Sequence, residues 1–474
     1  MRFAGVLIGC LIAVTATAGC TPSSRDAPPG RTPSEAKAQA EEPTFGLLEE
    51  VKGSYRAALP RKTNKRCLKR ALKGVTPAPN SRLLELQGDH PIGGHTYDIG
   101  WIAGAIERLR GLRFKQLPAI AFMTSKELSA RFDRSVDSRY SEARFLARED
   151  ILRMIGAVGP NDDLRSANVY WQGRDIRGFY DPRAKRVFTP YQGPGLELTD
   201  RQREVLAHEL VHALADQRLP DPKPKKEGFT DVDAALASAA VQEGDAMFVQ
   251  NLFRAAALDR APFIYERLKF RKRDRPYLVR QVSFPYIDGY SFACQMFVRN
   301  GWKGVDRLYR DPPTTTAEIL WPRRYLKGVD PAEPRGFLTS VEGWEVREEA
   351  SFGALDLIGL FEAPGARKKD RIAPLKKIGA VVEDWNGGRL ALFRDPRDVS
   401  AIAIGLETRR PGSALCDALG RWAKALVFGE ERATKGTEAF VLAALDRAAV
   451  ITCDGTEIRV GLAPDVATAR AFTR

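Results

Sequence analysis

The chain has 474 residues, and its 74 Lys and Arg against 60 Asp and Glu give a formal net charge of +14. Hydrophobic residues make up 44% of the sequence, which excludes a wholly disordered chain, and the length is sufficient for two or three domains. The positive charge fits attraction to anionic lipid headgroups or cell-wall polymers, or simply a solvated basic surface. No nucleic-acid-binding motif accompanies the charge, so we expect no nucleic-acid partner.

The first twenty residues predict export. A positive start at Met1-Arg2 precedes an apolar stretch, residues 6–14, that is too short to span a bilayer. Thr17-Ala-Gly-Cys20 then resembles a lipoprotein signal-peptidase site. We therefore expect residues 1–19 to be a lipoprotein signal peptide and Cys20 to be lipidated; the alternative is an ordinary secretory signal peptide. The expected location is the cell envelope, on a lipid anchor in the outer membrane that faces the periplasm, or outside the cell.

Composition divides the rest of the chain. Residues 20–44 are rich in Pro, Ser, Ala and charge, which predicts a disordered tether. Residues 45–75 predict a basic helical arm and residues 76–364 a catalytic domain. After a linker candidate at residues 364–371, residues 372–474 predict a small module. The expected fold class is α+β: a mainly helical domain with a small upstream sheet, followed by a small C-terminal α+β module.

Residues 169–189 predict the small upstream sheet. Residues 169–173 and 175–180 read as strands, Asp181-Pro182 begins a turn, and residues 186–189 read as the returning strand. An edge strand at this place can bind an extended peptide through main-chain hydrogen bonds. The alternative is a hairpin that only packs under the next helix, and the two interpretations are compatible.

The next segment contains His208-Glu-Leu-Val-His212 in a predicted helix. Thr199 and Gln202 have the spacing of a capping box, and Pro220 ends the element. Residues i and i+4 share one helix face, so both imidazoles can reach one metal ion, and Glu209 can take a proton from water beside it. The alternative is an accidental histidine pair.

A second predicted helix, residues 233–253, carries Glu243 among small and apolar residues. A carboxylate in such surroundings is costly to bury unless it is paired or bound to a metal. Catalytic metal sites of this type use three protein ligands and leave one position for water. We therefore take Glu243 as the third ligand; the alternative is a surface glutamate of an amphipathic helix.

Together the two helices resemble the gluzincin metallopeptidases, and within them bacterial lipoprotein and membrane-associated members with the patterns His-Glu-Leu-Val-His-Ala-Leu-x-Asp-Gln and Glu-Gly-Asp-Ala. The resemblance extends roughly over residues 100–330 and includes three weaker segments at residues 110–112, 178–182 and 313–322. It implies a zincin-like catalytic domain with one zinc ion per chain. The implied zinc ligands are His208, His212 and Glu243, with Glu209 as the general base.

Two aspartates are candidates for orienting the ligands. Asp216 lies one turn after His212 on the same face, a spacing that thermolysin-like relatives share, and Asp245 follows Glu243 by two residues. For both, a solvated helix charge is the alternative.

The chain departs from the family at the oxyanion stabiliser. Thermolysin-like enzymes use a later histidine, but no histidine follows His212 here. A tyrosine, an arginine or an upstream histidine must then donate to the developing oxyanion. Our first candidate is Tyr325. The other candidates are Arg323, Arg324, Tyr286, Tyr290, His90 and His95. The two histidines could instead form a second metal site, or they could be loop residues without such a role.

Removal of Cys10 with the signal and lipidation of Cys20 leave four cysteines, whose spacing fits no zinc knuckle. An oxidising compartment favours disulfides. We expect Cys416 to pair with Cys453, and Cys67 with Cys294, which would tie the basic arm to the catalytic domain.

The C-terminal module carries no chemical motif, so packing on the catalytic domain and partner binding both remain open. The expected strands are residues 380–382, 389–393, 399–404 and 449–452, and the expected helices are residues 413–426 and 437–448.

The sequence therefore predicts a lipid-anchored zinc metalloendopeptidase that acts on a peptide or protein substrate. One alternative is a non-catalytic envelope lipoprotein that binds a partner or cell-wall polymer. Another keeps the zinc chemistry but hydrolyses a cell-wall peptide amide. The oligomeric state is not indicated.

Overall fold

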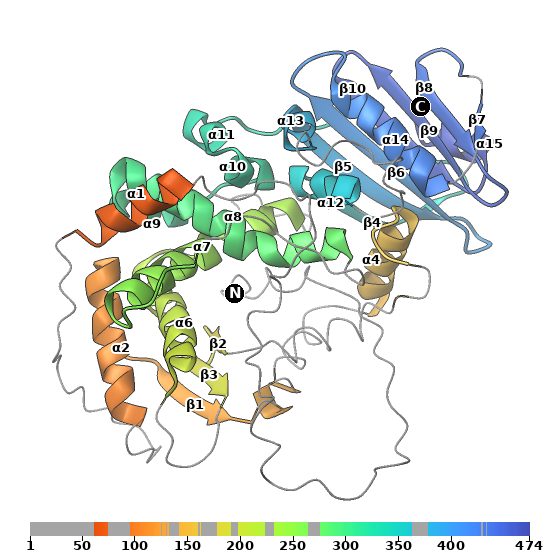
Figure 1. Cartoon of the computed structure of the whole chain (residues 1–474). Coiled ribbons are helices and arrows are strands. Elements are labelled where there is room, and N and C mark those ends of the chain that lie inside the picture. Colours follow the sequence, from red (N-terminus) through yellow and green to blue (C-terminus); the bar gives the residue numbers. More distant parts are fainter. Residues whose placement is uncertain are drawn as a thin grey trace, which may run out of the picture.

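The computed structural model describes residues 61–73, 95–124, 126–128, 130–131, 142–159, 162, 178–190, 198–222, 232–263, 275–362, 378–427, 430–432 and 434–474. The predicted signal peptide, Cys20, the tether, His90, the strand at residues 169–173 and the linker at 364–371 lie outside these residues. The fold is α+β, as the sequence predicts, with a helical part and two sheets of unequal size (Figure 1). None of the described helices is long and apolar enough to cross a membrane.

The helical part surrounds a pair of long helices, α7 (Val232–Ala256) and α8 (Pro276–Asn300). The other helices of this part are α1 (Arg61–Ala71), α2 (His95–Arg110), α6 (Asp200–Arg218), α9 (Trp302–Arg310), α10 (Thr316–Leu320) and α11 (Pro322–Lys327). The small sheet has the order β1-β3-β2, with β1 (Ala119–Met123) parallel to β3 (Arg186–Pro190) and β2 (Phe179–Asp181) antiparallel to it. The predicted hairpin is therefore present, and β2 and β3 both contact α6.

The larger sheet is antiparallel throughout and has the order β4-β5-β6-β10-β9-β8-β7. Its strands are β4 (Glu345–Ser351), β5 (Trp385–Arg394), β6 (Ser400–Thr408), β7 (Glu430–Glu431), β8 (Glu438–Ala443), β9 (Ala448–Asp454) and β10 (Glu457–Ala463). Side chains alternate between its two faces. Ile402 and Ile404 enter one buried cluster, while Ala401 and Ala403 enter another, so both faces are covered.

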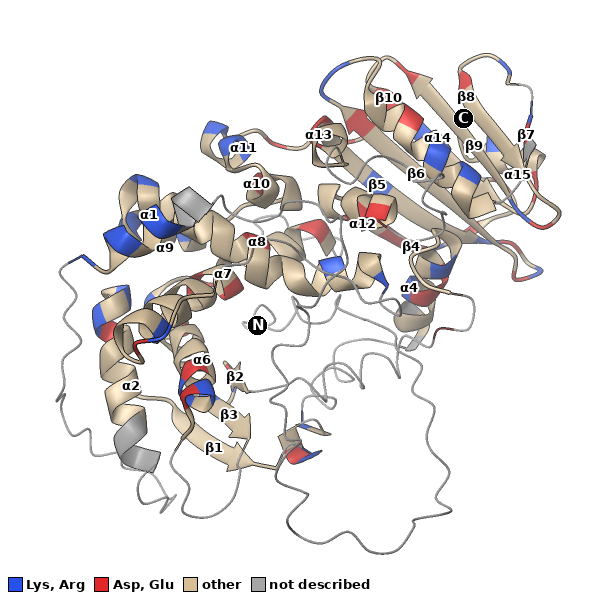
Figure 2. Cartoon of the chain, viewed as in Figure 1, with Lys and Arg blue, Asp and Glu red and all other residues tan. Residues whose placement is uncertain are grey.

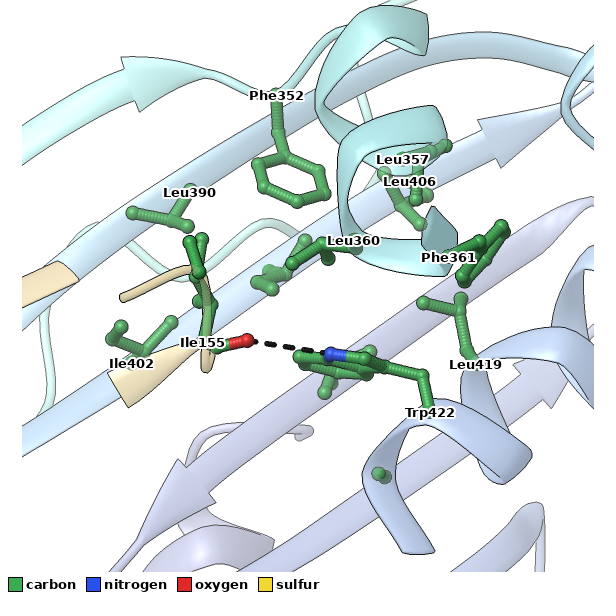
Figure 3. Packing of buried hydrophobic residues seen from close by; sticks show 14 of the residues in the cluster. Ile155, Phe352, Leu357, Leu360, Phe361, Leu390, Ile402, Leu406, Leu419 and Trp422 are labelled. Atoms are coloured by element: carbon green, nitrogen blue, oxygen red, sulfur yellow. Dashed lines mark hydrogen bonds between the residues drawn. The ribbon is translucent and has the colours of Figure 1, made fainter. Parts of the chain in front are cut away.

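Helices from distant parts of the chain cover one face of this sheet. They are α4 (Glu142–Met154), α12 (Ala354–Glu362), α13 (Ile378–Val382) and α14 (Ala414–Val427). In this core the indole nitrogen of Trp422 donates to the carbonyl oxygen of Ile155 at 3.3 Å, beside Phe352 and Leu390 (Figure 3). The short α15 (Val466–Ala471) packs on the other face through Phe472, which follows it.

The predicted domain boundary near residue 364 needs correction. Strand β4 precedes it in the chain, yet it pairs with β5 and forms an edge of the large sheet. Helix α12 also precedes it and packs into the core of that sheet. The C-terminal module therefore incorporates residues that the sequence assigned to the catalytic domain.

The secondary structure of two segments of the module was predicted wrongly. Residues 380–382, expected as a strand, belong to helix α13, which buries Ile378 and Val382 one turn apart. Residues 437–448, expected as a helix, contain β8 and the turn into β9. The run Phe440-Val-Leu-Ala-Ala444 is apolar without alternation because both faces of the sheet are covered, and such a run cannot be distinguished from a buried helix by periodicity. The other predicted strands and the helix at 413–426 correspond to β5, β6, β9 and α14.

Two disulfides link elements that are distant in sequence. Cys67 of α1 is bonded to Cys294 of α8, and Cys416 of α14 is bonded to Cys453 of β9. Both are the pairs that the sequence suggested. The first fixes the basic helix α1 to the long helix α8.

Helices α7 and α8 touch backbone to backbone at a pair of glycines. A Cβ atom on Gly244 would overlap the carbonyl group of Gly289, and a Cβ on Gly289 would overlap the carbonyl oxygen of Ala240. Only glycine allows the two helix axes to come this close. Gly244 directly follows Glu243, so the close approach also determines where Glu243 lies.

Replacement of Gly244 by alanine has two opposing effects on the free energy of unfolding, a gain in helix propensity and a steric clash with α8. Helix propensity alone would stabilise the protein by about 1 kcal/mol. Because the added methyl group must push α8 away, we expect instead a loss of about 1–3 kcal/mol in the free energy of unfolding. Urea denaturation followed by circular dichroism measures the sign. Gly289→Ala should give the same loss, and a stabilised Gly244→Ala variant would contradict the close contact.

Candidate metal centre

Helix α6 carries the two motif histidines and begins as the sequence predicts. The hydroxyl of Thr199 accepts from the backbone N–H of Gln202, and the Gln202 side chain accepts from the backbone N–H of Thr199. The helix ends at Arg218, with Leu219 as its C-cap. Its apolar residues are buried against α2 and α7, which fixes the rotation of the helix about its axis.

Three side chains converge where α6 meets α7. Nε2 of His208 lies 3.1 Å from Nε2 of His212 and 2.9 Å from a carboxylate oxygen of Glu243. The same oxygen lies 3.4 Å from Nε2 of His212. The chain thus brings together the three residues that the sequence selected as ligands, and they form a group that could hold a metal ion.

The distances between the three candidate ligand atoms fit tetrahedral coordination of one metal ion. Metal bonds of 2.0–2.2 Å in tetrahedral geometry place neighbouring ligand atoms about 3.3–3.6 Å apart. The three observed separations are within a few tenths of an ångström of this range. Two imidazole nitrogens and one carboxylate oxygen also form a donor set that binds divalent transition metals well.

The charges at the centre are strongly coupled. Burial raises the pKa of the Glu243 carboxyl, but the adjacent imidazoles overcome this effect and hold that pKa well below its usual range. Burial lowers the pKa of His212, yet the Glu243 carboxylate outweighs it and raises that pKa to about 9. Glu243 is therefore an anion at neutral pH, which is the state in which a carboxylate binds a cation.

Glu209 lies beside the same group and is buried. Burial raises the pKa of its carboxyl, an effect that the two imidazoles and the backbone N–H of Tyr180 partly offset. The chain at Gly178 passes so close that a Cβ there would lie 3.4 Å from Cγ of Glu209. The small sheet therefore runs directly past the proposed base. A buried carboxylate with a raised pKa is suited to accept and return a proton.

Gln250 is a site residue that the sequence analysis missed. Nε2 of His208 faces Glu243, and Nδ1 lies 3.1 Å from Oε1 of Gln250. With Nε2 as the ligand atom, Nδ1–H donates to this amide oxygen, which fixes the tautomer and the plane of the ring. Position 250 follows Glu243 by two helical turns on the same face, and this spacing could have identified it.

The two aspartates have other partners than predicted. Asp216 was expected to orient an imidazole, but its carboxylate accepts from the Tyr180 hydroxyl at 2.7 Å and pairs with Lys185 at 2.6 Å. It therefore joins α6 to the β2–β3 hairpin. Asp245 was expected to bond a ligand, but it is fully buried and accepts from Arg110 at 2.9 Å and from Tyr309 at 3.0 Å. Its charge also contributes to the raised pKa of His212.

The first candidate for the oxyanion stabiliser is not supported either. The Tyr325 hydroxyl donates to the carbonyl oxygen of Asp311 at 2.8 Å, and its ring packs edge-on against Phe292. Arg324 is also engaged elsewhere, because it donates to the carbonyl oxygen of Trp385 at 2.7 Å and so ties α11 to β5. Both residues connect structural elements away from the three ligands.

Among the tyrosine candidates, Tyr286 is the one next to the ligands. Its ring stacks on the imidazole of His208, with centroids 6.2 Å apart and planes inclined by 25°. Tyr290, one turn further along α8, is buried against Phe248 instead. His95 begins α2, but the position of its side chain is outside the described part of the structure.

Comparison with protein-family models, with curated proteins and with solved structures gives no match to this chain. The interpretation of the centre therefore depends on its own geometry and donor chemistry.

Gln250 offers a test of the centre that needs no substrate. Gln250→Leu leaves Nδ1 of His208 without its acceptor, so we expect the affinity for a divalent metal ion to fall roughly 10- to 100-fold. Competition with a chromophoric chelator measures this affinity. Gln250→Glu keeps an acceptor oxygen and should retain most of it.

Gln242 provides the matched control. It is a buried glutamine of the same helix, and its amide nitrogen has no hydrogen-bond partner within the described residues. Gln242→Leu should leave the metal affinity unchanged. Equal losses in the two leucine variants would show that Gln250 does not orient His208.

Proposed function

We propose that the protein is a zinc-dependent peptidase that hydrolyses peptide bonds with a glutamate as general base. The observation that carries this proposal is the placement of Glu209 beside the group formed by His208, His212 and Glu243. A purely structural zinc site has four protein ligands and needs no adjacent base, whereas three ligands beside a buried carboxylate are typical of hydrolytic centres. The resemblance of the two motifs to gluzincins supports the same reaction class.

When bound, zinc polarises the carbonyl group under attack and lowers the pKa of a coordinated water. Glu209 would accept a proton from the water that attacks the carbonyl carbon and would return it to the nitrogen of the leaving amine. His208, His212 and Glu243 hold their donor atoms in place throughout. Gln250 keeps the His208 ring in its plane. Gly178, directly before β2, lies close to the Glu209 side chain, which is buried from bulk water.

We further propose Tyr286 as the donor to the developing oxyanion. A phenolic hydroxyl can supply the hydrogen bond that a later histidine supplies in thermolysin-like enzymes. Its ring lies over His208, whereas Tyr325 is bonded to Asp311. With Tyr286 in this role, the absence of a histidine after His212 does not count against catalysis.

The cellular setting belongs to the same proposal. Lipidation at Cys20 would hold the enzyme at the envelope membrane, facing the periplasm. Two disulfides among the described residues agree with an oxidising compartment.

The proposal predicts a separation of turnover from metal binding. Zinc-loaded protein comprising residues 21–474 is incubated with a complex peptide library and with cell-wall peptides, and new termini are read by mass spectrometry. We expect cleavage by the intact protein and a loss of roughly a hundredfold or more with Glu209→Gln, because the proton acceptor is gone. That variant should keep its zinc through dialysis, while Glu243→Ala should lose it. Normal cleavage by Glu209→Gln would refute the mechanism.

Tyr286→Phe tests the oxyanion donor. Removal of the hydroxyl should lower kcat roughly 100- to 1,000-fold and leave KM and bound zinc nearly unchanged, because the hydrogen bond forms only as charge develops. Tyr325→Phe is the matched control and should retain kcat. The assignment fails if Tyr286→Phe turns over normally.

A further inference from the structure

Helix α1 presents an unusually basic surface. Residues 61–73 contain seven Lys or Arg and no Asp or Glu. Cys67, Leu68 and Ala71 are buried, while Lys65, Arg66, Lys69, Arg70 and Lys73 are exposed. The helix thus buries its apolar residues against the protein and exposes its positive charge. Figure 2 shows Lys and Arg along much of α1.

The helix is held rigidly in this orientation. The disulfide between Cys67 and Cys294 bonds it to α8, and the guanidinium of Arg70 donates to the carbonyl oxygen of Val298. Both contacts lie on one side of α1, so they fix its rotation about the helix axis. A surface that is fixed in this way loses little conformational freedom when it docks.

The neighbouring corner between α8 and α9 adds charge of the same sign. Arg299 and Lys303, which follow Val298 closely, are both exposed. Asp306, the acidic residue of α9, is drawn inward to Arg110 at 2.7 Å. We refer to the exposed residues Lys65, Arg66, Lys69, Arg70, Lys73, Arg299 and Lys303 as the cationic face. Within the described part of the chain no ion pair neutralises any of these seven.

The residue types of the cationic face indicate which class of polyanion it would bind. Single-stranded nucleic acids are bound by cationic grooves with aromatic side chains on which bases stack. The residues of α1 that are described as exposed are all Lys or Arg. The two disulfides also indicate an oxidising compartment, where nucleic acid is not the usual partner. An exposed array of Lys and Arg suits the phosphate headgroups of an anionic bilayer.

We propose that the cationic face docks on the surface of a membrane rich in anionic phospholipids. It then acts beside the lipid anchor proposed at Cys20, which precedes Arg61 by 41 positions in the chain. A lipid anchor and a basic patch on the same chain act together, so the two-part attachment is stronger than either part alone. The docking itself does not depend on the peptidase activity.

The test uses residues 21–474, which retain every described residue and carry no lipid. The protein is sedimented with vesicles of equal parts phosphatidylglycerol and phosphatidylcholine, and with vesicles of phosphatidylcholine alone. We expect binding to the anionic vesicles only, and weaker binding as salt is added. Each Lys or Arg contributes about fivefold to such binding, so the triple variant Lys65→Gln, Arg66→Gln, Lys69→Gln should bind roughly a hundredfold more weakly.

A matched control removes the same charge elsewhere. Arg432, Lys435 and Arg447 are exposed near the β7–β8–β9 edge of the large sheet. Their triple replacement by Gln should reduce binding far less than the α1 variant. Equal losses in the two triple variants would show that net charge, and not this face, drives the binding.

Two further results would overturn the proposal. One is failure of the unaltered protein to sediment with the anionic vesicles. The other is tighter binding to a soluble polyanion, such as single-stranded DNA or an anionic cell-wall polymer, than to vesicles at the same salt concentration. Because the replaced side chains are exposed, thermal unfolding should be the same for all variants. Peptidase activity is measured in parallel, so a failure of the docking proposal can be distinguished from a failure of the proposed function.

Discussion

The close contact between α7 and α8 at Gly244 and Gly289 is the constraint on which the candidate metal centre depends. It fixes the position of α7, and its rotation about the helix axis, next to Glu243. Both sides of that position are held by buried carboxylates. Asp233, near the start of α7, accepts from the backbone N–H of Thr316 in α10 at 3.1 Å, and Asp245 is held by Arg110 and Tyr309. A helix fixed in this way can present Glu243 to two histidines without any adjustment of its own backbone.

This arrangement gives a physical meaning to the weaker segments that accompany the two motifs in the sequence. Arg110 reaches Asp245 and stacks on Trp302, so residues 110–112 hold α2 to α7 and α9. The segment at residues 313–322 contains the capping box of Thr315 and Glu318 and the bond from Thr316 to Asp233. Through these bonds the two segments support the helix that carries Glu243.

Site residues could be predicted from the sequence where their partners are close in the sequence, and not where their partners are distant. His208, Glu209 and His212 share one helix, and their relative placement follows from helical geometry alone. The cap at Thr199 is equally local. Asp216 and Tyr325 could not be assigned correctly, because their partners are distant in the sequence. Asp216 bonds to a hairpin 31–36 residues upstream, and Tyr325 bonds to Asp311, 14 residues upstream at the end of α9. The large sheet shows the same pattern: β5, β6 and β9 were recognisable locally, whereas the membership of β4 depends on pairing across the predicted boundary.

The bond from Trp422 to Ile155 joins residues 267 positions apart, and the core around it includes α4, α12 and the large sheet. A chain synthesised from its N-terminus makes α4 long before the strands that cover it. The apolar face of α4 therefore stays without its final partner until nearly the whole polypeptide has emerged, and native structure around it cannot be completed one segment at a time. If the protein is exported as proposed, this delay is an advantage, because a chain that cannot finish folding early remains competent for threading through a translocation channel.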